Sequence, residues 1–162
     1  MDLISNWQQI RQHFSRCFRS NFHVSIASVD NNNLPTVTPI GSLFLNSDQT
    51  GFYFEKYPSK LPEHAEHNKN ICVLAVNSNT WFWLRSLYNL RFPTYPAIKL
   101  YGQLGAKRKA TDIEISRLQR RMKATKWTKG NQYLWGDMNE VRDITFTRSE
   151  KINIGKMTAH LP

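Results

Sequence analysis

The chain has 162 residues and a mass of 19.0 kDa, the size of one domain with its own core. Hydrophobic residues make up 40% and charged residues 21%, a composition that excludes disordered, collagen-like and low-complexity chains. No apolar run reaches the roughly 18 residues that a membrane span needs, and residues 1–14 lack the apolar centre of a signal peptide. We therefore expect a single domain over residues 1–162, located in the cytoplasm and not in a membrane.

The net charge of +10 is concentrated in one segment. Residues 99–129 hold ten of the 22 Lys and Arg residues but two of the 12 Asp and Glu residues. A basic protein of this kind can bind nucleic acid, an anionic membrane or a phosphorylated small molecule. Charge alone does not choose among these partners.

The first third of the chain predicts one helix and three strands. Residues 3–18 place apolar side chains at helical spacing. Residues 23–29 and 35–45 read as two strands joined by the Asp-Asn-Asn-Asn turn, and residues 52–56 as a third, aromatic strand. We expect these three strands to pair as a meander.

The middle of the chain alternates between helix and strand. Residues 59–69 predict a short helix, and residues 71–76 an apolar strand buried on both sides. The aromatic segment 81–96 is expected to be partly helical. Residues 97–107 predict a further strand, with Gly102 and Gly105 as points of bulge or close approach.

The last third begins with a capping box at residues 111–114, which predicts a helix to about residue 125. Its expected buried stripe is Ile115, Leu118 and Met122, and its basic face is expected to be solvated. That basic face carries Arg117, Arg120, Arg121 and Lys123. Two final strands are predicted over residues 141–147 and 151–154.

These elements predict a mainly β fold, an antiparallel barrel of six to seven strands, which the resemblance described below makes a split barrel. Helices are expected at the N-terminus, between strands and before the last strands. The irregular alternation of strand and helix disfavours a doubly wound sheet. Neither G-x-G-x-x-G nor G-x-x-x-x-G-K-[ST] occurs, so the two common nucleotide cradles are absent from the sequence.

Residues 28–76 carry a resemblance to a known family. They read strand, turn, LPTVTPI, turn, GFYFEKYPSK, helix and NICVLAV, and WFW at 81–83 and IKLYG at 98–102 continue the order. This order resembles the pyridoxamine 5′-phosphate oxidase-like superfamily, the FMN-binding split barrels. The resemblance covers about residues 20–107 well and implies FMN as cofactor, commonly held between two subunits of a homodimer.

The resemblance also implies which residues contact the cofactor. Ser59 and Lys60 match the family's Ser-x-Lys, where a hydroxyl and an ammonium at a helix start favour a phosphate. By spacing alone, Ser59 could instead cap the helix and Lys60 be a solvated charge. The remaining implied cofactor-binding residues are Thr38, Pro39, Ile40, Phe54, Glu55, Lys99 and Trp135.

Two features of the sequence depart from the oxidases proper. Their second strand supplies an Arg and a Lys to the flavin, whereas the matching stretch here is Thr38, Pro39, Ile40 and Gly41. Ala97 also stands where those enzymes tend to carry Gln. The resemblance therefore does not identify the substrate. Glu55, an implied cofactor contact, can equally be a strand residue whose side chain points outward.

No motif indicates a metal site or a catalytic nucleophile. His64 and His67 lie three apart in a predicted helix, without H-E-x-x-H or a further ligand, and are expected on a solvated face. Cys17 is on a predicted buried stripe and Cys72 in an apolar strand, settings that keep thiols reduced and unreactive.

Three functions stay open at this point. The first is an FMN-dependent oxidoreductase, a homodimer with a small-molecule substrate and NAD(P)H as a candidate reductant. The second is a non-catalytic flavin- or haem-binding stress or carrier protein. The third is a basic nucleic-acid-binding protein that uses residues 111–129, which we rank last because no nucleic-acid motif is present.

Overall fold

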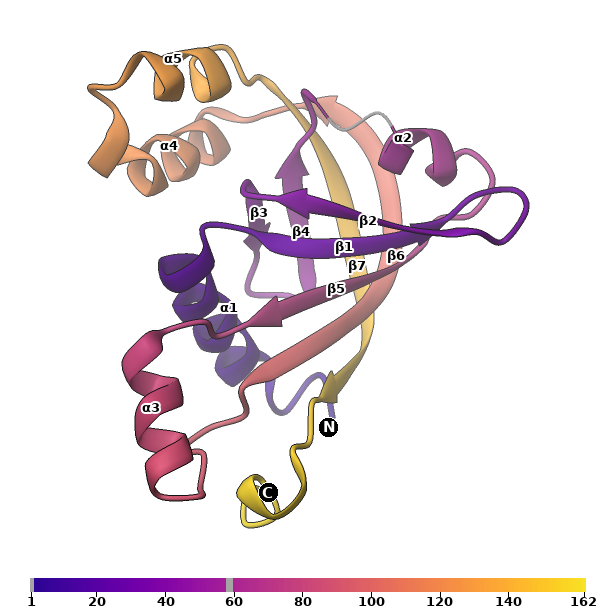
Figure 1. Ribbon diagram of the computed structural model, residues 1–162. Helices are drawn as coiled ribbons and strands as arrows, with labels where there is room; N and C mark the ends of the chain where they lie inside the picture. The colour runs from indigo at the N-terminus through magenta and orange to yellow at the C-terminus, as the bar shows by residue number, and fades with distance from the viewer. Residues whose placement is uncertain (1, 58–59) are drawn as a thin grey trace.

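The computed structural model describes residues 2–57 and 60–162, and in these residues seven strands form one curled, fully antiparallel sheet (Figure 1). Their order across the sheet is β2-β1-β5-β6-β7-β4-β3. The strands are β1 (Val24–Val29), β2 (Pro35–Ile40), β3 (Leu43–Leu45), β4 (Thr50–Phe54), β5 (Asn70–Val76), β6 (Ala97–Lys109) and β7 (Glu140–Lys151). The predicted mainly β, split-barrel class with flanking helices is confirmed.

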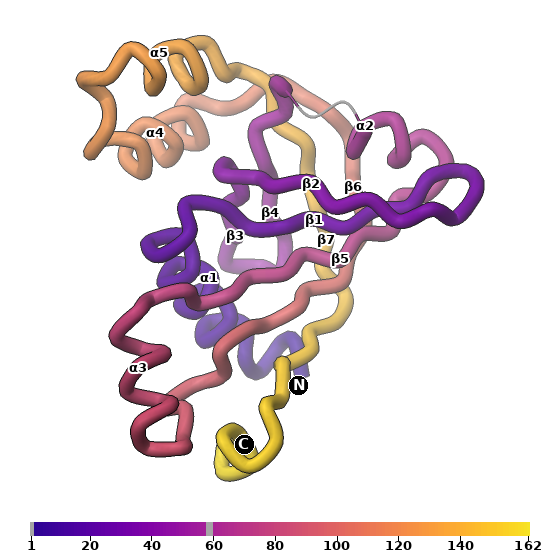
Figure 2. Tube along the Cα trace, viewed as in Figure 1, coloured from indigo at the N-terminus to yellow at the C-terminus, as the bar shows by residue number. Residues whose placement is uncertain are grey.

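The helices lie at the ends of the sheet and on its faces (Figures 1 and 2). They are α1 (Trp7–Asn21), α2 (Lys60–Ala65), α3 (Thr80–Tyr88), α4 (Asp112–Arg121) and α5 (Lys129–Trp135), with short 3₁₀ turns η1 (Lys123–Thr125) and η2 (Gly155–Met157). None of the helices in the described residues is long and apolar enough to span a membrane.

The main core lies inside the curl of the sheet. The apolar stripe of α1 is buried there, including Trp7, Ile10 and Phe14, and packs against inward side chains of the strands. A smaller core lies under α4, where Leu118 contacts a cluster that includes Phe44, Phe52 and Phe54. Two apolar faces of the sheet are therefore covered by helices.

The predicted meander is wrong in one respect. Residues 35–45 do not form one strand, because the chain breaks at Gly41 and Ser42. A Cβ at Gly41 would lie 3.1 Å from the Phe22 carbonyl oxygen and 3.2 Å from the Trp135 ring, so a larger residue there would require these neighbours to shift slightly. Because of this break, β2 and β3 stand at opposite ends of the strand order, which is the split in the barrel.

The end of the chain also differs from the prediction. The two final strands are one strand, β7, which pairs with β6 along its length and with β4. The pairing with β6 shifts register between Tyr101 and Gly102 and between Leu104 and Lys107. A Cβ at Gly102 would lie 2.3 Å from the Thr145 carbonyl oxygen, which confirms the predicted close approach there.

Two other elements differ from the prediction. β5 was expected to be buried on both sides, but its residues alternate between buried and half-buried, so one of its faces is open. The aromatic segment contains the regular helix α3, capped by Asn79, whose side chain accepts a hydrogen bond from the Phe82 backbone N–H. Trp81 and Tyr88 on this helix are exposed.

Candidate functional site

The outward face of β2, β1, β5 and β6 is the open face of the sheet. The strand register aligns Pro39, Ser25, Leu74 and Lys99 in one row across these strands, and Val37, Ala27, Cys72 and Tyr101 in the next. In Figure 1 these strands cross the front of the molecule. Most of these side chains are half-buried, and Val37 is 63% exposed. The open face is therefore an apolar surface that no described helix covers.

A polar cluster borders the open face at β6 and β7. Lys99 Nζ lies 3.0 Å from Glu150 Oε1, and the Tyr101 hydroxyl donates to Glu150 Oε2 at 2.9 Å. The Arg148 guanidinium carbon lies 3.8 Å from the centre of the Tyr101 ring. Hydrogen bonds from Lys99 and then Tyr101 lower the pKa of Glu150, so this carboxylate stays ionised and fixes Lys99 at the border.

The predicted second-strand residues lie on two faces of β2. Pro39 belongs to the open face, whereas Thr38 and Ile40 alternate with it and pair with Ile26 and Val24 on the inward side. β2 is the end strand of the sheet, so its outer edge has no strand partner in the described residues. That edge leaves backbone hydrogen-bonding groups unpaired next to the open face.

Lys60 begins α2 and is exposed, with an ion pair of 3.1 Å to Glu63 on the same helix. Ser59 lies outside the described residues. The backbone N–H of Leu34 lowers the pKa of Asp30 most, and the charge of Lys60 also contributes to this lowering. Lys60 is therefore near the turn between β1 and β2, which makes it an unburied cation at one end of the edge strand.

Phe54 and Glu55 are buried and lie away from the open face. The Phe54 ring packs edge-on against Phe44 and Phe52 in the core under α4. The Glu55 carboxylate accepts hydrogen bonds from Tyr53 Oη at 2.5 Å and from Arg142 Nε at 2.5 Å. The alternative that Glu55 points outward from its strand is therefore wrong.

Trp135 ends α5 and is half-buried against the same core as Phe54. Its ring lies beside Gly41, directly after β2. The structure therefore brings Pro39 and Lys99 onto one face, and Phe54 and Trp135 together under α4. It does not gather those predicted cofactor residues that the structure describes into a single cavity.

The predicted solvated basic face is confirmed for Arg120 and Lys123, which are exposed, but is wrong for Arg117 and Arg121. The guanidinium carbon of Arg121 lies 3.6 Å from the centre of the Phe44 ring, and that of Arg117 lies 5.1 Å from the same centre. Both side chains turn toward the sheet. Sequence reasoning missed this, although Arg117 and Arg121 stand four residues apart and adjoin the predicted buried stripe at Leu118 and Met122.

The histidines and cysteines have structural contacts. His64 is buried, contrary to the expected solvated face, and its Nδ1 lies 2.9 Å from Ser28 Oγ on β1. No group of three or more His, Cys, Asp or Glu residues in the described part of the chain could hold a metal ion. Burial raises the pKa of the Cys17 thiol to about 12 and also raises that of Cys72, as expected for unreactive thiols.

Several solved structures have the same fold as this chain. An FMN-binding protein from Syntrophomonas wolfei has 11% identity and a TM-score of 0.59, and the match covers 93% of this chain and 94% of that protein's chain. A candidate pyridoxamine 5′-phosphate oxidase from Lactobacillus delbrueckii has 15% identity and a TM-score of 0.52, with 86% and 90% covered. HutZ, the haem storage protein of Vibrio cholerae, has 8% identity and a TM-score of 0.55, with 89% and 92% covered.

No family model and no curated protein matches the sequence. The structural likeness spans nearly the whole chain, including the C-terminal third that the sequence resembles only loosely. The chain therefore has the split-barrel fold of the pyridoxamine 5′-phosphate oxidase-like proteins, and the recognition made from residues 28–76 is confirmed at the level of fold.

Proposed function

We propose that this protein is an FMN-binding oxidoreductase that acts on a small molecule, with NAD(P)H as a candidate reductant. The observation that carries the proposal is the split barrel itself, which an FMN-binding protein shares, with the unpaired edge of β2 beside the open face. FMN supplies the electron and hydride chemistry, while the chain binds and orients it and excludes water.

The edge of β2 fits a flavin ring. A flavin is a large apolar plate with a few polar edges, and it needs an apolar surface together with a small number of hydrogen-bonding groups. The ladder turns the backbone groups of Thr38 and Ile40 toward β1, so the outer edge offers the N–H of Val37 and the carbonyl oxygens of Val37 and Pro39, and the Pro39 ring adds an apolar surface that lacks a donor of its own.

Lys60, with Ser59, is proposed to hold the FMN phosphate. Lys60 is exposed, and its one ion pair within residues 2–57 and 60–162 is with a neighbouring exposed glutamate, an interaction worth about 0–1 kcal/mol. A phosphate can displace that glutamate at small cost and gains a charge-assisted contact. Lys99 is proposed to contact the cofactor from the other border of the open face, and the contacts of Phe54, Glu55 and Trp135 with the flavin remain predictions.

A second copy of this chain is proposed to cover the open face. The face is broad, since it spans four strands that lie about 4.8 Å apart, and its two central rows are mostly apolar. An exposed apolar sheet face of this kind marks an interaction surface. A homodimer would bury Val37 and Leu74 and enclose the edge of β2, which would exclude water from a flavin held there.

The absorption spectrum of the purified protein tests the proposal. A flavin spectrum, release of FMN identified by mass, and bleaching by NADH or NADPH are the expected results. A flavin spectrum without reduction would favour the non-catalytic carrier. A haem spectrum instead would favour the haem-binding alternative, for which the likeness to HutZ is the supporting observation. A colourless protein that binds neither FMN nor haem would contradict the proposal.

A further inference from the structure

A cavity of about 820 Å³ lies between α1, β3, the end of α4 and Trp135. Small-molecule sites have volumes of about 300–1,000 Å³, so this cavity is large enough for an organic ligand. Much of its lining is apolar and aromatic, including Phe14, Phe18, Leu43, Phe44 and Met122. Pro39, Lys60 and Lys99 do not line it, whereas Trp135, which is also a predicted flavin contact, does.

All the charged side chains that line the cavity are positive. Five arginines line the cavity, at positions 11, 19, 117, 120 and 121, and no Asp or Glu does. None of the five forms an ion pair with any residue in 2–57 or 60–162. No carboxylate in the described chain therefore pairs directly with the positive charge of the cavity.

The inner arginines are held by neutral groups. Arg121 Nη1 donates to the carbonyl oxygen of Leu43 at 2.5 Å, and its guanidinium lies over the Phe44 and Phe18 rings. Arg117 donates to Asn46 Oδ1 at 2.8 Å and to the Leu45 carbonyl oxygen at 3.0 Å. Burial, and then the charge of Arg117, lower the pKa of Arg121 to about 9.

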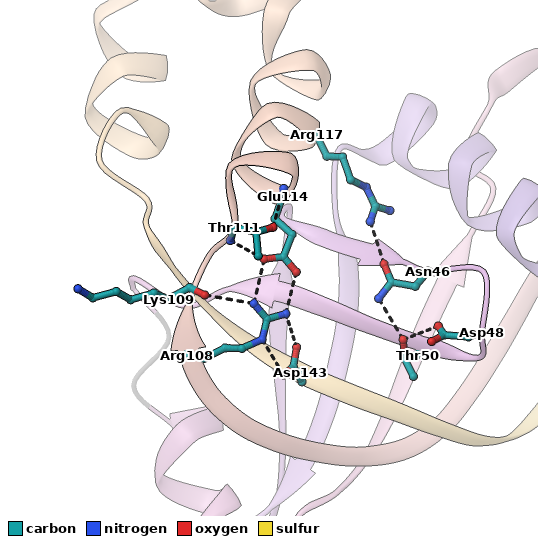
Figure 3. Close-up of polar contacts among 9 residues, drawn as sticks. All are labelled: Asn46, Asp48, Thr50, Arg108, Lys109, Thr111, Glu114, Arg117 and Asp143. Atoms are coloured by element: carbon teal, nitrogen blue, oxygen red, sulfur yellow. Dashed lines mark hydrogen bonds and ion pairs between the residues drawn. The ribbon is translucent and has the colours of Figure 1, made fainter.

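The nearest carboxylate of α4 is already engaged elsewhere (Figure 3). Glu114 accepts hydrogen bonds from Arg108 at 2.7 and 2.9 Å and from the Thr111 backbone N–H at 2.8 Å. Arg108 also pairs with Asp143 on β7. This network fixes the start of α4 to the sheet, so Glu114 is not free to neutralise Arg117 or Arg121.

A partly buried cation that is held by carbonyls and ring faces lacks the compensation of a carboxylate. An anion that enters the cavity would supply it, because guanidinium groups bind carboxylates and phosphates through paired, charge-assisted hydrogen bonds. The aromatic lining would at the same time bury an apolar body. Arg19 and Arg120 are exposed and would attract such an anion from solution.

We propose that this cavity binds an amphipathic organic anion, with its carboxylate or phosphate against the arginines and its apolar body against the aromatic lining. A carboxylate and a phosphate both offer anionic oxygens to the arginines, and the titration described next distinguishes them. Apart from Trp135, the described lining of this site shares no residue with the predicted flavin contacts, and the inference does not depend on flavin binding.

Calorimetric titration of the full chain with decanoate, decyl phosphate and 1-decanol tests the proposal. We expect one anion per chain, bound at least tenfold more tightly than the neutral alcohol, and the tighter of the two anions identifies the headgroup. Arg121→Met should weaken anion binding by roughly tenfold or more. Arg91→Met, which removes an arginine outside the cavity, should leave it unchanged.

A second variant does not depend on removing a buried arginine. Ser15 is exposed on α1 and lines the cavity, so Ser15→Trp should obstruct part of the cavity and weaken anion binding without disturbing the core. Gln12→Trp, an exposed position on the same helix outside the cavity, is the matched control. FMN binding should be the same in both variants.

Three results would overturn the inference. Decanol could bind as tightly as both anions, or Ser15→Trp could still bind the anion as the wild type does. Alternatively, Ser15→Trp could lose FMN while Gln12→Trp keeps it, which would assign the cavity to the flavin. Failure of FMN to bind any variant would count against the proposed function only, since the anion titrations are read independently of it.

Discussion

Arg142 on β7 binds the carboxylate of Glu55, directly after β4, through two hydrogen bonds of 2.5 and 2.9 Å. Both side chains are largely buried, and the Tyr53 hydroxyl donates a third hydrogen bond to the same carboxylate. The ion pair therefore ties the end of β4 to its neighbour β7. A residue that the family resemblance assigns to the cofactor is, in this fold, part of the framework of β4 and β7.

Glu55→Gln should destabilise the fold. The variant leaves the buried guanidinium of Arg142 without a counter-charge, and breaking a buried ion pair costs about 3–5 kcal/mol. Urea unfolding at neutral pH measures the loss. Glu140→Gln is the matched control, because its pair with Lys107 is exposed and should contribute less than about 1 kcal/mol. Equal losses in the two variants would contradict a structural role for Glu55.

The same pair should make the fold sensitive to acid. Burial alone would raise the pKa of Glu55, but the hydrogen bonds from Arg142 and Tyr53 outweigh it and the pKa lies below its ordinary value. A lowered folded-state pKa stabilises the fold above the unfolded-state pKa of about 4.3, and this stabilisation is lost as pH falls through the folded-state pKa. The unfolding free energy of the wild type should therefore fall more steeply below pH ~4.3 than that of Glu55→Gln.

The open face predicts a homodimer of about twice 19.0 kDa. Val37→Lys should shift the protein toward the monomer, because it places a charge within an apolar interface. Ile113→Lys is a matched control, since Ile113 is 76% exposed, compared with 63% for Val37, but lies on α4 away from the open face. Light scattering at low micromolar concentration distinguishes the two. A monomeric wild type that still binds flavin would rule out this interface.

The basic segment should not bind DNA in the manner of a phosphate-contacting surface. Arg117 and Arg121 face the cavity, and Arg108 is engaged by Glu114 and Asp143, so the segment presents fewer free cations than its sequence suggests. A non-specific binder that contacts many phosphates loses about 10³-fold or more in affinity between 50 and 200 mM salt. Tight binding to duplex or single-stranded DNA with such a salt dependence would reverse our ranking of functions.

The sequence predicted the fold better than the site because the order of elements along the chain and their hydrophobic periodicity are local signals. Residues 28–76 specify hairpin, aromatic strand, short helix and apolar strand in sequence, and the structure has these elements in that order. The break at Gly41 depends on a close approach of Trp135, a residue far away in the chain. No local pattern records that contact.

The placement of site residues depends on register, which the sequence does not give. Pro39 and Lys99 share a row only because three successive strand pairings align them, and a shift of one residue in any pairing would put them on opposite faces. Glu55 was ambiguous for the same reason. The inward turn of Arg121 was not predicted because an arginine beside an apolar stripe is usually solvated.

Lys60→Ala tests the proposed grip on the FMN phosphate. Loss of a hydrogen bond to a charged group costs roughly 1.5–3 kcal/mol, so FMN affinity should fall about 10- to 150-fold. Riboflavin has no phosphate, and its affinity should be unchanged. The melting temperature of the apoprotein should also be unchanged, because the pair of Lys60 with Glu63 is exposed.

Lys69→Ala, which removes an exposed lysine shortly after the same helix, is the matched control and should change the affinity for neither FMN nor riboflavin. Equal losses of FMN and riboflavin, or no loss of FMN, would exclude Lys60 from the phosphate site and leave the exposed edge of β2 without a cation to hold the cofactor's charged end.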